Sequence, residues 1–171
     1  QLEKAIETYE RGIALEINNP TSAAYCYRNR ASIYEKQKLF DKALADYNKA
    51  ISLDPINASR YIARGNFYSE YKMQYYDALV DYTLAISLDS LTPNNWWVRG
   101  MLFSDKLNNN QSAINDFKQL LKLDSNNISS INWLGIFNFR IGHYQLAKMY
   151  FELAIEKHKQ SKIINKNYKL E

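Results

Sequence analysis

The chain has little cysteine, proline or glycine. Its 171 residues include one cysteine, three prolines and five glycines. The lone Cys26 excludes an intramolecular disulfide. So few helix-breaking residues, with no strand-like alternation, predict an almost entirely helical chain. No apolar run approaches the roughly 20 residues of a membrane span, and no signal-peptide pattern is present, so we expect an intracellular, cytoplasmic location.

Patterns typical of catalysis, cofactor binding and metal binding are also missing. His143 and His158 have no second histidine, cysteine or glutamate at ligand spacing, so we expect no metal site. There is no glycine-rich phosphate loop, and Cys26 has no histidine at a fixed local spacing. Carboxylates occur singly on helix faces, where solvation is their ordinary role. We therefore expect a protein that is not an enzyme, with no catalytic residues and no cofactor.

The net charge of +4 and the pI near 9.0 raise the question of a nucleic-acid partner. The excess lysines, however, gather at the end of the chain. They are Lys157, Lys159, Lys162, Lys166 and Lys169. We interpret residues 161–171 as a basic tail or a capping helix, and the alternative is an anion-binding element.

A motif written four times dominates the sequence. Each copy has an aromatic or apolar residue, a small residue four positions later, and a third residue, aromatic in three of the copies, three positions beyond that. The copies are Tyr27/Ala31/Tyr34, Tyr61/Gly65/Tyr68, Trp96/Gly100/Phe103 and Ile131/Gly135/Asn138. A second block follows each copy, and a fifth such block opens the chain. These blocks are Ala43/Tyr47/Ala50, Ala78/Tyr82/Ala85, Ala113/Phe117/Leu120, Ala147/Phe151/Ala154 and, at the start, Ala5/Tyr9/Gly12. Their first alanines are 38, 35, 35 and 34 residues apart, a period typical of helical solenoids.

The repeat resembles the tetratricopeptide repeat (TPR), most fully in the unit that runs from Tyr27 to Pro55. The resemblance covers about residues 2 to 159. It implies an all-α fold of two antiparallel helices per repeat, stacked into a right-handed superhelix with a concave groove that binds peptides or partner proteins. We expect helices at 2–16, 21–37, 40–52, 57–72, 75–88, 93–106, 110–123, 127–141 and 144–159. Because later repeats replace Pro55 by Ser90, Ser125 and Lys159, we expect Asp89, Asp124 and nearby Ser and Asn residues to act as helix N-caps there.

These repeats predict one TPR domain over residues 1–160. It comprises a half-repeat at 1–17 and four repeats at about 23–56, 57–91, 92–126 and 127–160. The half-repeat lacks its partner helix, so we expect the chain to be a fragment of a longer protein. Within each hairpin we expect the small residue of the first helix to face the first alanine of the second, as Gly65 would face Ala78.

Three repeats share an arginine and an aspartate that the last repeat lacks. Arg30, Arg64 and Arg99 precede the small residue where the family more often has leucine, and Asp46, Asp81 and Asp116 precede the second-helix aromatic. Both positions change together in the last repeat, to Leu134 and Tyr150. We interpret each pair as a contact across its hairpin, because a single partner would be a partly buried unmatched charge. The alternative is that the arginines hold a ligand carboxylate in the groove.

The candidate binding surface follows from the resemblance, which places the first helices on the groove. First-helix positions that point away from the packing residues include Glu35 and Glu70. The predicted groove residues are Tyr25, Arg28, Ser32, Lys36, Ile62, Asn66, Trp97, Met101, Asn132, Ile136, Phe139 and Arg140. Five of these residues could form a contiguous apolar floor that binds an apolar segment of a partner protein. They are Ile62, Trp97, Met101, Ile136 and Phe139.

Trp97 is the sharpest single signal in this set. Its neighbour Trp96 occupies the packing position, so Trp97 turns about 100° away around the helix. A large aromatic on a binding face is a hot-spot candidate. The alternative is that Trp97 packs within the stack, on Phe139 or Met101, or beneath a neighbouring domain.

Two ligand classes can be weighed against this set. Chaperone-binding members of the family hold a terminal carboxylate with lysine, asparagine and arginine. The matching positions here are Arg28, Ser32, Ala63, Asn94 and Val98, or Ile62, Asn66, Val98, Ser129 and Trp133. Neither set makes a carboxylate clamp, so a heat-shock-protein C-terminus is disfavoured. We expect a protein scaffold, and the alternative is an RNA-binding solenoid that uses Arg28, Lys36 and Arg140 with stacking on Tyr25 and Trp97.

Overall fold

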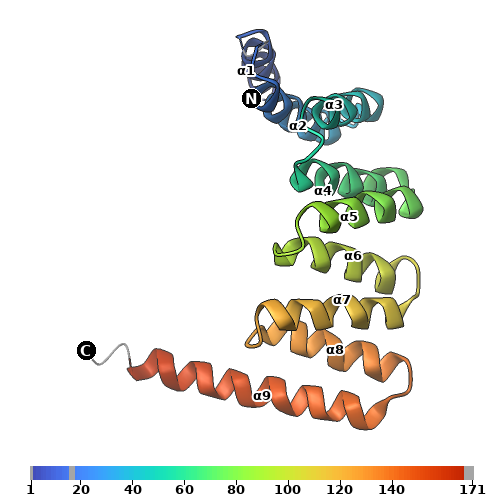
Figure 1. Ribbon diagram of the computed structural model, residues 1–171, viewed down its shortest axis with the longest axis vertical. Coiled ribbons are helices and arrows are strands. Elements are labelled where there is room, and N and C mark those ends of the chain that lie inside the picture. Colours follow the sequence, from blue (N-terminus) through green and yellow to red (C-terminus); the bar gives the residue numbers. More distant parts are fainter. Residues whose placement is uncertain (1, 16–17, 168–171) are drawn as a thin grey trace. The chain divides into compact units, whose positions relative to one another are not determined.

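The computed structural model describes residues 2–15 and 18–167, and side chains as far as Lys162 (Figure 1). The described residues form helices and no strands. The helices are α1 (Leu2–Leu15), α2 (Pro20–Lys36), α3 (Phe40–Leu53), α4 (Ala58–Phe67) with the π-helical turn η1 (Tyr68–Lys72), α5 (Tyr75–Leu88), α6 (Pro93–Asp105), α7 (Asn110–Leu123), α8 (Ile128–Arg140) and α9 (Tyr144–Asn167). The all-α prediction is confirmed, and most ends agree within one residue. Gln1, residues 16–17 of the predicted half-repeat, and residues 168–171 of the predicted tail, including Lys169, lie outside the described residues.

The chain divides into two compact units, residues 1–90 and 91–171. In the first unit α2 pairs with α3 and α4 with α5, while α1 packs on α2. In the second unit α6 pairs with α7 and α8 with α9, and α7 packs on α8. Every pair is a helical hairpin of the predicted kind. The first helices of the hairpins are α2 and α4 in one unit and α6 and α8 in the other.

Four of the helices have an asparagine as N-cap. Asn19, Asn57, Asn109 and Asn127 precede α2, α4, α7 and α8, and each side-chain oxygen accepts a hydrogen bond from a backbone N–H of the first turn. These bonds satisfy donors that have no partner inside the helix. The prediction that Asp89 and Asp124 are N-caps is wrong. They lie at the C-caps of α5 and α7, because both helices run to the leucine immediately before them.

The turn inside each hairpin contains one residue with positive φ. These residues are Lys38 (60°), Met73 (52°), Asn108 (49°) and Gly142 (83°). The second and third hairpins hold one residue more between the small residue and the following alanine than the first and last do. In the second hairpin η1 absorbs that residue, because a π-turn fits an extra residue into a helix. The sequence predicted an α-helix through this segment.

Small residues let the paired helices approach closely, but they face different partners from those predicted. A Cβ added to Gly65 would lie 2.6 Å from a ring carbon of Tyr82, and one added to Gly100 would lie 2.8 Å from a ring carbon of Phe117. The nearest groups are therefore the second-helix aromatics, and not Ala78 or Ala113. The aromatic rings fill the space that the missing side chain leaves.

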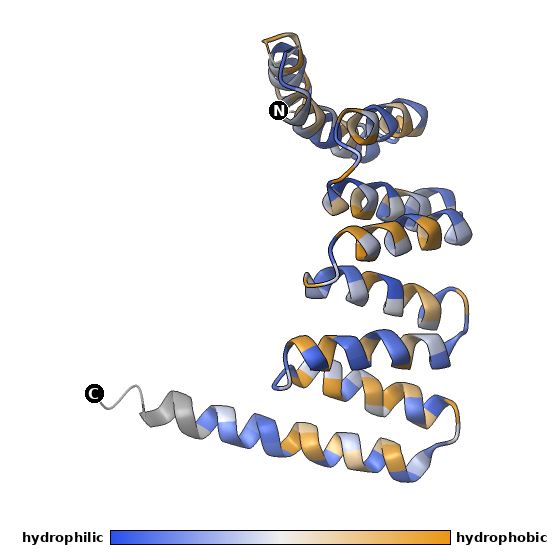
Figure 2. Ribbon diagram, viewed as in Figure 1, coloured by the Kyte–Doolittle hydropathy of each residue, from blue (hydrophilic) through white to orange (hydrophobic). Residues whose placement is uncertain are grey.

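Helix α9 continues past residue 159, where the repeat pattern predicted its end, to Asn167. Its hydrophobic residues lie mainly in the first half of the helix (Figure 2). Among the described residues, no helix is both long enough and apolar enough to cross a membrane.

Candidate functional site

The repeated Arg and Asp residues form three ion pairs across hairpins. Arg30, Arg64 and Arg99 each donate two hydrogen bonds, of 2.7 to 2.9 Å, to Asp46, Asp81 and Asp116 in turn. The three aspartates are buried. The hydrogen bond to Asp81 raises the pKa of Arg64 above its usual value, so the guanidinium stays charged.

The last repeat replaces this pair by apolar packing. Leu134 is fully buried, and Tyr150 packs against the same cluster. The structural interpretation of the Arg and Asp residues is thereby confirmed. The alternative, in which these arginines hold a ligand carboxylate, is wrong because bidentate bonds already engage them.

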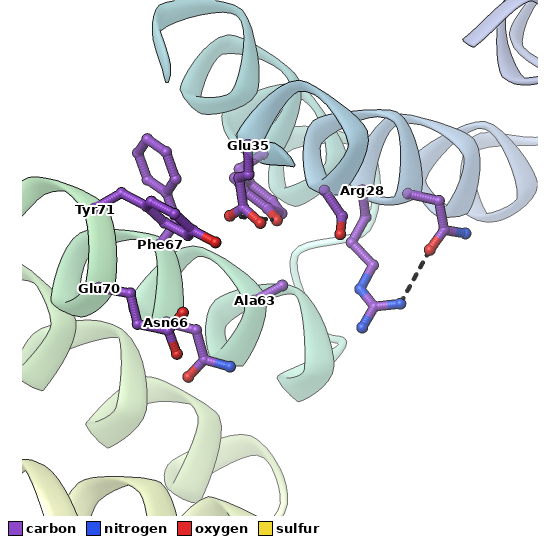
Figure 3. A pocket seen from close by; sticks show the side chains of 10 residues that line it. Arg28, Glu35, Ala63, Asn66, Phe67, Glu70 and Tyr71 are labelled. Atoms are coloured by element: carbon purple, nitrogen blue, oxygen red, sulfur yellow. Dashed lines mark hydrogen bonds between the residues drawn. The ribbon is translucent and has the colours of Figure 1, made fainter. Parts of the chain in front are cut away.

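A cavity of about 220 Å³ lies between α2 and α4 of the first unit (Figure 3). It takes side chains from the first helices of two successive repeats, with Tyr47 from α3 and two residues of η1 at its edge. Its lining residues are Arg28, Asn29, Ser32, Glu35, Tyr47, Ala63, Asn66, Phe67, Glu70 and Tyr71. We call it the α2–α4 cavity.

Two carboxylates line the α2–α4 cavity. Glu35 comes from α2 and Glu70 from η1. Figure 3 shows Glu35 directed toward the space between the helices and Glu70 beside Asn66. The hydroxyl of Tyr47 donates a 2.9 Å hydrogen bond to the Glu35 carboxylate. Arg28 lies farther along the cavity, where its guanidinium donates to the side-chain oxygen of Asn29.

Electrostatics at Glu35 are unfavourable to its charged form. Burial raises the pKa of Glu35 above its usual value, and the negative charge of Glu70 adds to that rise. The hydrogen bond from Tyr47 acts in the opposite direction but does not cancel the effect. Burial also raises the pKa of Tyr47, which therefore remains a donor to Glu35.

Each of the four buried aspartates in the described chain has an arginine partner, and Glu35 has none. The pairs are Asp46 with Arg30, Asp54 with Arg60, Asp81 with Arg64, and Asp116 with Arg99. Within the described residues, Glu35 has the Tyr47 hydroxyl and the Glu70 carboxylate as neighbours, and the nearby cations Arg28 and Lys36 form no ion pair with it. Two carboxylates and one cation line the cavity, so its lining carries net negative charge.

The structure separates the predicted groove residues of the first unit. Arg28, Ser32 and Asn66 line the α2–α4 cavity, and the side-chain oxygen of Asn66 also accepts a hydrogen bond of 2.7 Å from Tyr82. Tyr25 and Lys36 are exposed outside it. Ile62 is buried, so its predicted place on an exposed apolar floor is wrong.

Trp97 and Met101 of the second unit pack against its hydrophobic core. The Trp97 ring centroid lies 5.0 Å from that of Phe117 and 6.4 Å from that of Trp133. The indole is therefore part of the packing between α6, α7 and α8. This agrees with the alternative in which Trp97 packs within the stack, with Phe117 and Trp133 as its aromatic partners in place of Phe139.

The remaining predicted residues of the second unit lie on α8. Asn132 is exposed and Ile136 is half-buried. Phe139 is exposed beside Tyr144, with ring centroids 5.5 Å apart. Arg140 donates a 2.6 Å hydrogen bond to Ser104 of α6.

Sequence reasoning missed the meeting of Glu35 and Glu70. The two residues are 35 positions apart, which is one repeat, and that spacing was a usable signal. Counted from the small residue, however, Glu35 is four positions on and Glu70 is five positions on. The extra residue in η1 brings Glu70 rather than Ser69 to the cavity, and nothing in the helical period predicted this shift.

Arg60 was also missed. It is buried, bonds to Asp54 and to the backbone oxygen of Thr21, and lines a second cavity of about 440 Å³ at the start of α2 and α4. Among the described residues, no group of three or more His, Cys, Asp or Glu side chains could hold a metal ion.

Comparisons with known proteins agree with this architecture. Tetratricopeptide-repeat models match residues 24–57 and 93–127. No curated protein sequence matches the chain. Among solved structures, MamA is 19% identical with a TM-score of 0.77, covering 94% of this chain and 90% of MamA.

Two further similar structures are TPR proteins. YrrB, described as a TPR protein with an unusual peptide-binding site, is 24% identical with a TM-score of 0.70, covering 89% of this chain and 75% of YrrB. The first TPR of Spaghetti (RPAP3), bound to the HSP90 peptide SRMEEVD, is 25% identical with a TM-score of 0.62. That match covers 71% of this chain and 94% of the other. The matched repeats and the helical hairpins lead to one conclusion: this chain belongs to the tetratricopeptide-repeat family.

Proposed function

We propose that this chain is a non-enzymatic scaffold that binds a segment of a partner protein along the first helices of its hairpins. One observation carries the proposal: α2 and α4 enclose an open cavity lined by charged, amide and aromatic side chains. A few placed polar groups beside aromatic surface are typical of recognition sites. TPR proteins generally act as protein-interaction scaffolds, and both YrrB and the RPAP3 repeat are described with peptide sites.

A terminal carboxylate, or an acidic peptide such as the one bound to RPAP3, does not suit the α2–α4 cavity. Arg28 is the one cation that lines it, and Ser32 and Ala63 occupy two of the positions that a clamp would need. Glu35 and Glu70 would repel an acidic ligand at close range. The partner segment is therefore neutral or basic where it crosses this cavity.

In the second unit we propose that Phe139 and Asn132 on α8 provide the accessible contacts. Trp97 would act through its packing on Phe117 and Trp133, so Trp97→Ala is a poor probe of binding alone. Phe139→Ala is the better probe, because the exposed ring can be removed without opening the core.

An RNA-binding function is the second candidate. The contacts of the arginines that would bind RNA make this function less suitable. Arg140 is engaged by Ser104, and Arg28 shares its cavity with two carboxylates. An intracellular location remains part of our proposal, since a sequence with a single cysteine suits a reducing compartment.

A selection of random displayed dodecapeptides on the full chain would test the proposed function. We expect discrete peptides to be enriched and to bind in solution with weak salt dependence. Binding of single-stranded RNA, followed by fluorescence anisotropy at rising salt, gives the comparison, because contacts to phosphates weaken steeply with salt. Enrichment of no peptide, together with salt-sensitive RNA binding, would replace the scaffold by the RNA-binding function.

A further inference from the structure

We propose that the α2–α4 cavity takes the side chain of a lysine or arginine from the bound segment, between Glu35 and Glu70. This inference rests on the proposed function and names the chemistry of the partner at one position. Its basis is the meeting of two carboxylates, from successive repeats, at one cavity that supplies them with no ion pair.

Charge complementarity selects the ligand. Glu35 and Glu70 contribute two negative charges and Arg28 one positive charge, which lies farther along α2 (Figure 3). Elsewhere in the described chain, each buried carboxylate is matched by an arginine of the protein. A cation from a partner would give Glu35 the match that Asp46, Asp81 and Asp116 already have.

The rest of the lining suits a long side chain better than a bare ion. Ala63 and Tyr71 supply apolar surface for the methylene stem, and Tyr71 is 40% exposed. The Tyr71 ring can also attract the cationic head through its face. A calcium ion would need six to eight oxygen ligands, far more than two carboxylates provide.

The groups that face Glu35 leave a cation as the missing partner. Tyr47 of α3 donates to its carboxylate, Glu70 and Tyr71 approach from η1, and Arg28 and Lys36 act on it from its own helix. Burial and Glu70 together raise the pKa of Glu35. A bound ammonium or guanidinium would counteract that rise, since an opposite charge favours the ionised carboxylate.

Peptide pools with one fixed residue test the inference directly. Acetylated and amidated nonapeptides would carry Lys, Arg, citrulline, norleucine or Glu at the centre and randomised residues elsewhere. We expect the Lys and Arg pools to bind the full chain about tenfold more tightly than the citrulline and norleucine pools, because a charge-assisted bond is lost. The Glu pool should bind most weakly.

Two double variants of equal net charge locate the effect. Glu35→Gln with Glu70→Gln should abolish the preference for Lys and Arg. Glu3→Gln with Glu7→Gln, on the exposed surface of α1, should retain it. Glu70→Gln alone should reduce the preference, and because Glu70 is exposed this variant is expected to keep the fold. Circular dichroism melting confirms the fold of each variant.

The outcomes separate the inference from the proposed function. Equal binding of the Arg and norleucine pools, unchanged in the Glu35/Glu70 variant, would overturn the inference and leave peptide binding intact. A preference for Arg that survives in that variant would also overturn it, by placing the cation elsewhere. Absence of binding by every pool would overturn both.

Discussion

At the scale of single residues, two carboxylates of the first unit differ in whether the protein supplies a cation to pair with them. Asp81 is 1% exposed and receives two hydrogen bonds from Arg64, so its charge is matched within the protein. Glu35 has no such match. A charge removed from water is costly unless it is paired. Asp81 is paired and contributes to the fold, whereas Glu35 can still gain an ion pair from a ligand.

We expect the contributions of Arg64 and Asp81 to the free energy of unfolding to be strongly coupled. Arg64→Leu alone should reduce the free energy of unfolding by about 3 kcal/mol, because Asp81 would be a buried charge without a partner. Arg64→Leu with Asp81→Tyr, the combination of the last repeat, should recover part of the loss. Urea denaturation of both single variants and the double variant measures the coupling, and strictly additive losses would mean that the two side chains do not interact.

Glu35→Gln should not lower stability at neutral pH, and we expect an equal or higher Tm. The amide oxygen still accepts the Tyr47 hydrogen bond, while the partly buried charge and its repulsion by Glu70 are removed. The folded pKa of Glu35 is raised above the unfolded value, so its charge costs stability above the folded pKa. That cost is relieved as the pH falls through the folded pKa toward the unfolded value.

The pH dependence gives the control for this prediction. The difference in Tm between Glu35→Gln and the native chain should shrink as the pH falls through the folded pKa of Glu35. A native chain that is more stable than the variant at neutral pH would show that the carboxylate is stabilised by a group that its described neighbours do not include.

At the scale of elements, the hairpin turns are the strained parts of the chain. Each turn needs one residue in the left-handed region, and three repeats place Lys38, Met73 or Asn108 there, while the last has Gly142. A left-handed conformation costs a residue with a side chain about 1 to 2 kcal/mol, and glycine avoids that cost.

Glycine in the first two turns should therefore stabilise the protein. Lys38→Gly and Met73→Gly are each expected to raise the free energy of unfolding by up to about 1 kcal/mol, less the backbone entropy that glycine adds to the unfolded chain. The reverse change, Gly142→Ala, should lower it by a similar amount. Chemical denaturation of the three variants checks the signs, and a loss of stability in Met73→Gly would mean that its exposed side chain has a stabilising contact.

At the scale of the whole molecule, the hairpins should open unequally. The terminal helix α1 packs on α2 and has no buried residue, whereas α2, α3, α4, α7 and α8 each pack on two or more other helices of their unit. The stability of a repeat protein is approximately a sum over local interfaces. A helix at the end of the array has fewer interfaces and is therefore the least stable.

Hydrogen exchange should reveal this gradient. Amide protection is expected to be highest within residues 43 to 120 and lowest in α1 and in the part of α9 beyond residue 160, because α9 (Tyr144–Asn167) is longer than its partner α8 (Ile128–Arg140). Mass spectrometry of peptic fragments after timed exchange measures it. Uniform protection along the chain would contradict the prediction and indicate one cooperative unit.

The sequence by itself determined the helices, their pairing into hairpins and the Arg/Asp contacts. These features depend on residues close together in the chain, where the 3.6-residue period and the recurring small and aromatic residues act directly. The loss of both Arg and Asp in the last repeat was enough to predict the pairing that the structure confirms.

Only the tertiary structure decided which first-helix side chains are available to a ligand. Ile62 and Trp97 had the expected positions for a groove, yet one is buried and the other packs on Phe117. Glu35 and Glu70 meet because η1 shifts one helix by a residue against its neighbour. Such meetings depend on the register between helices one repeat apart, which the local period of either helix does not specify.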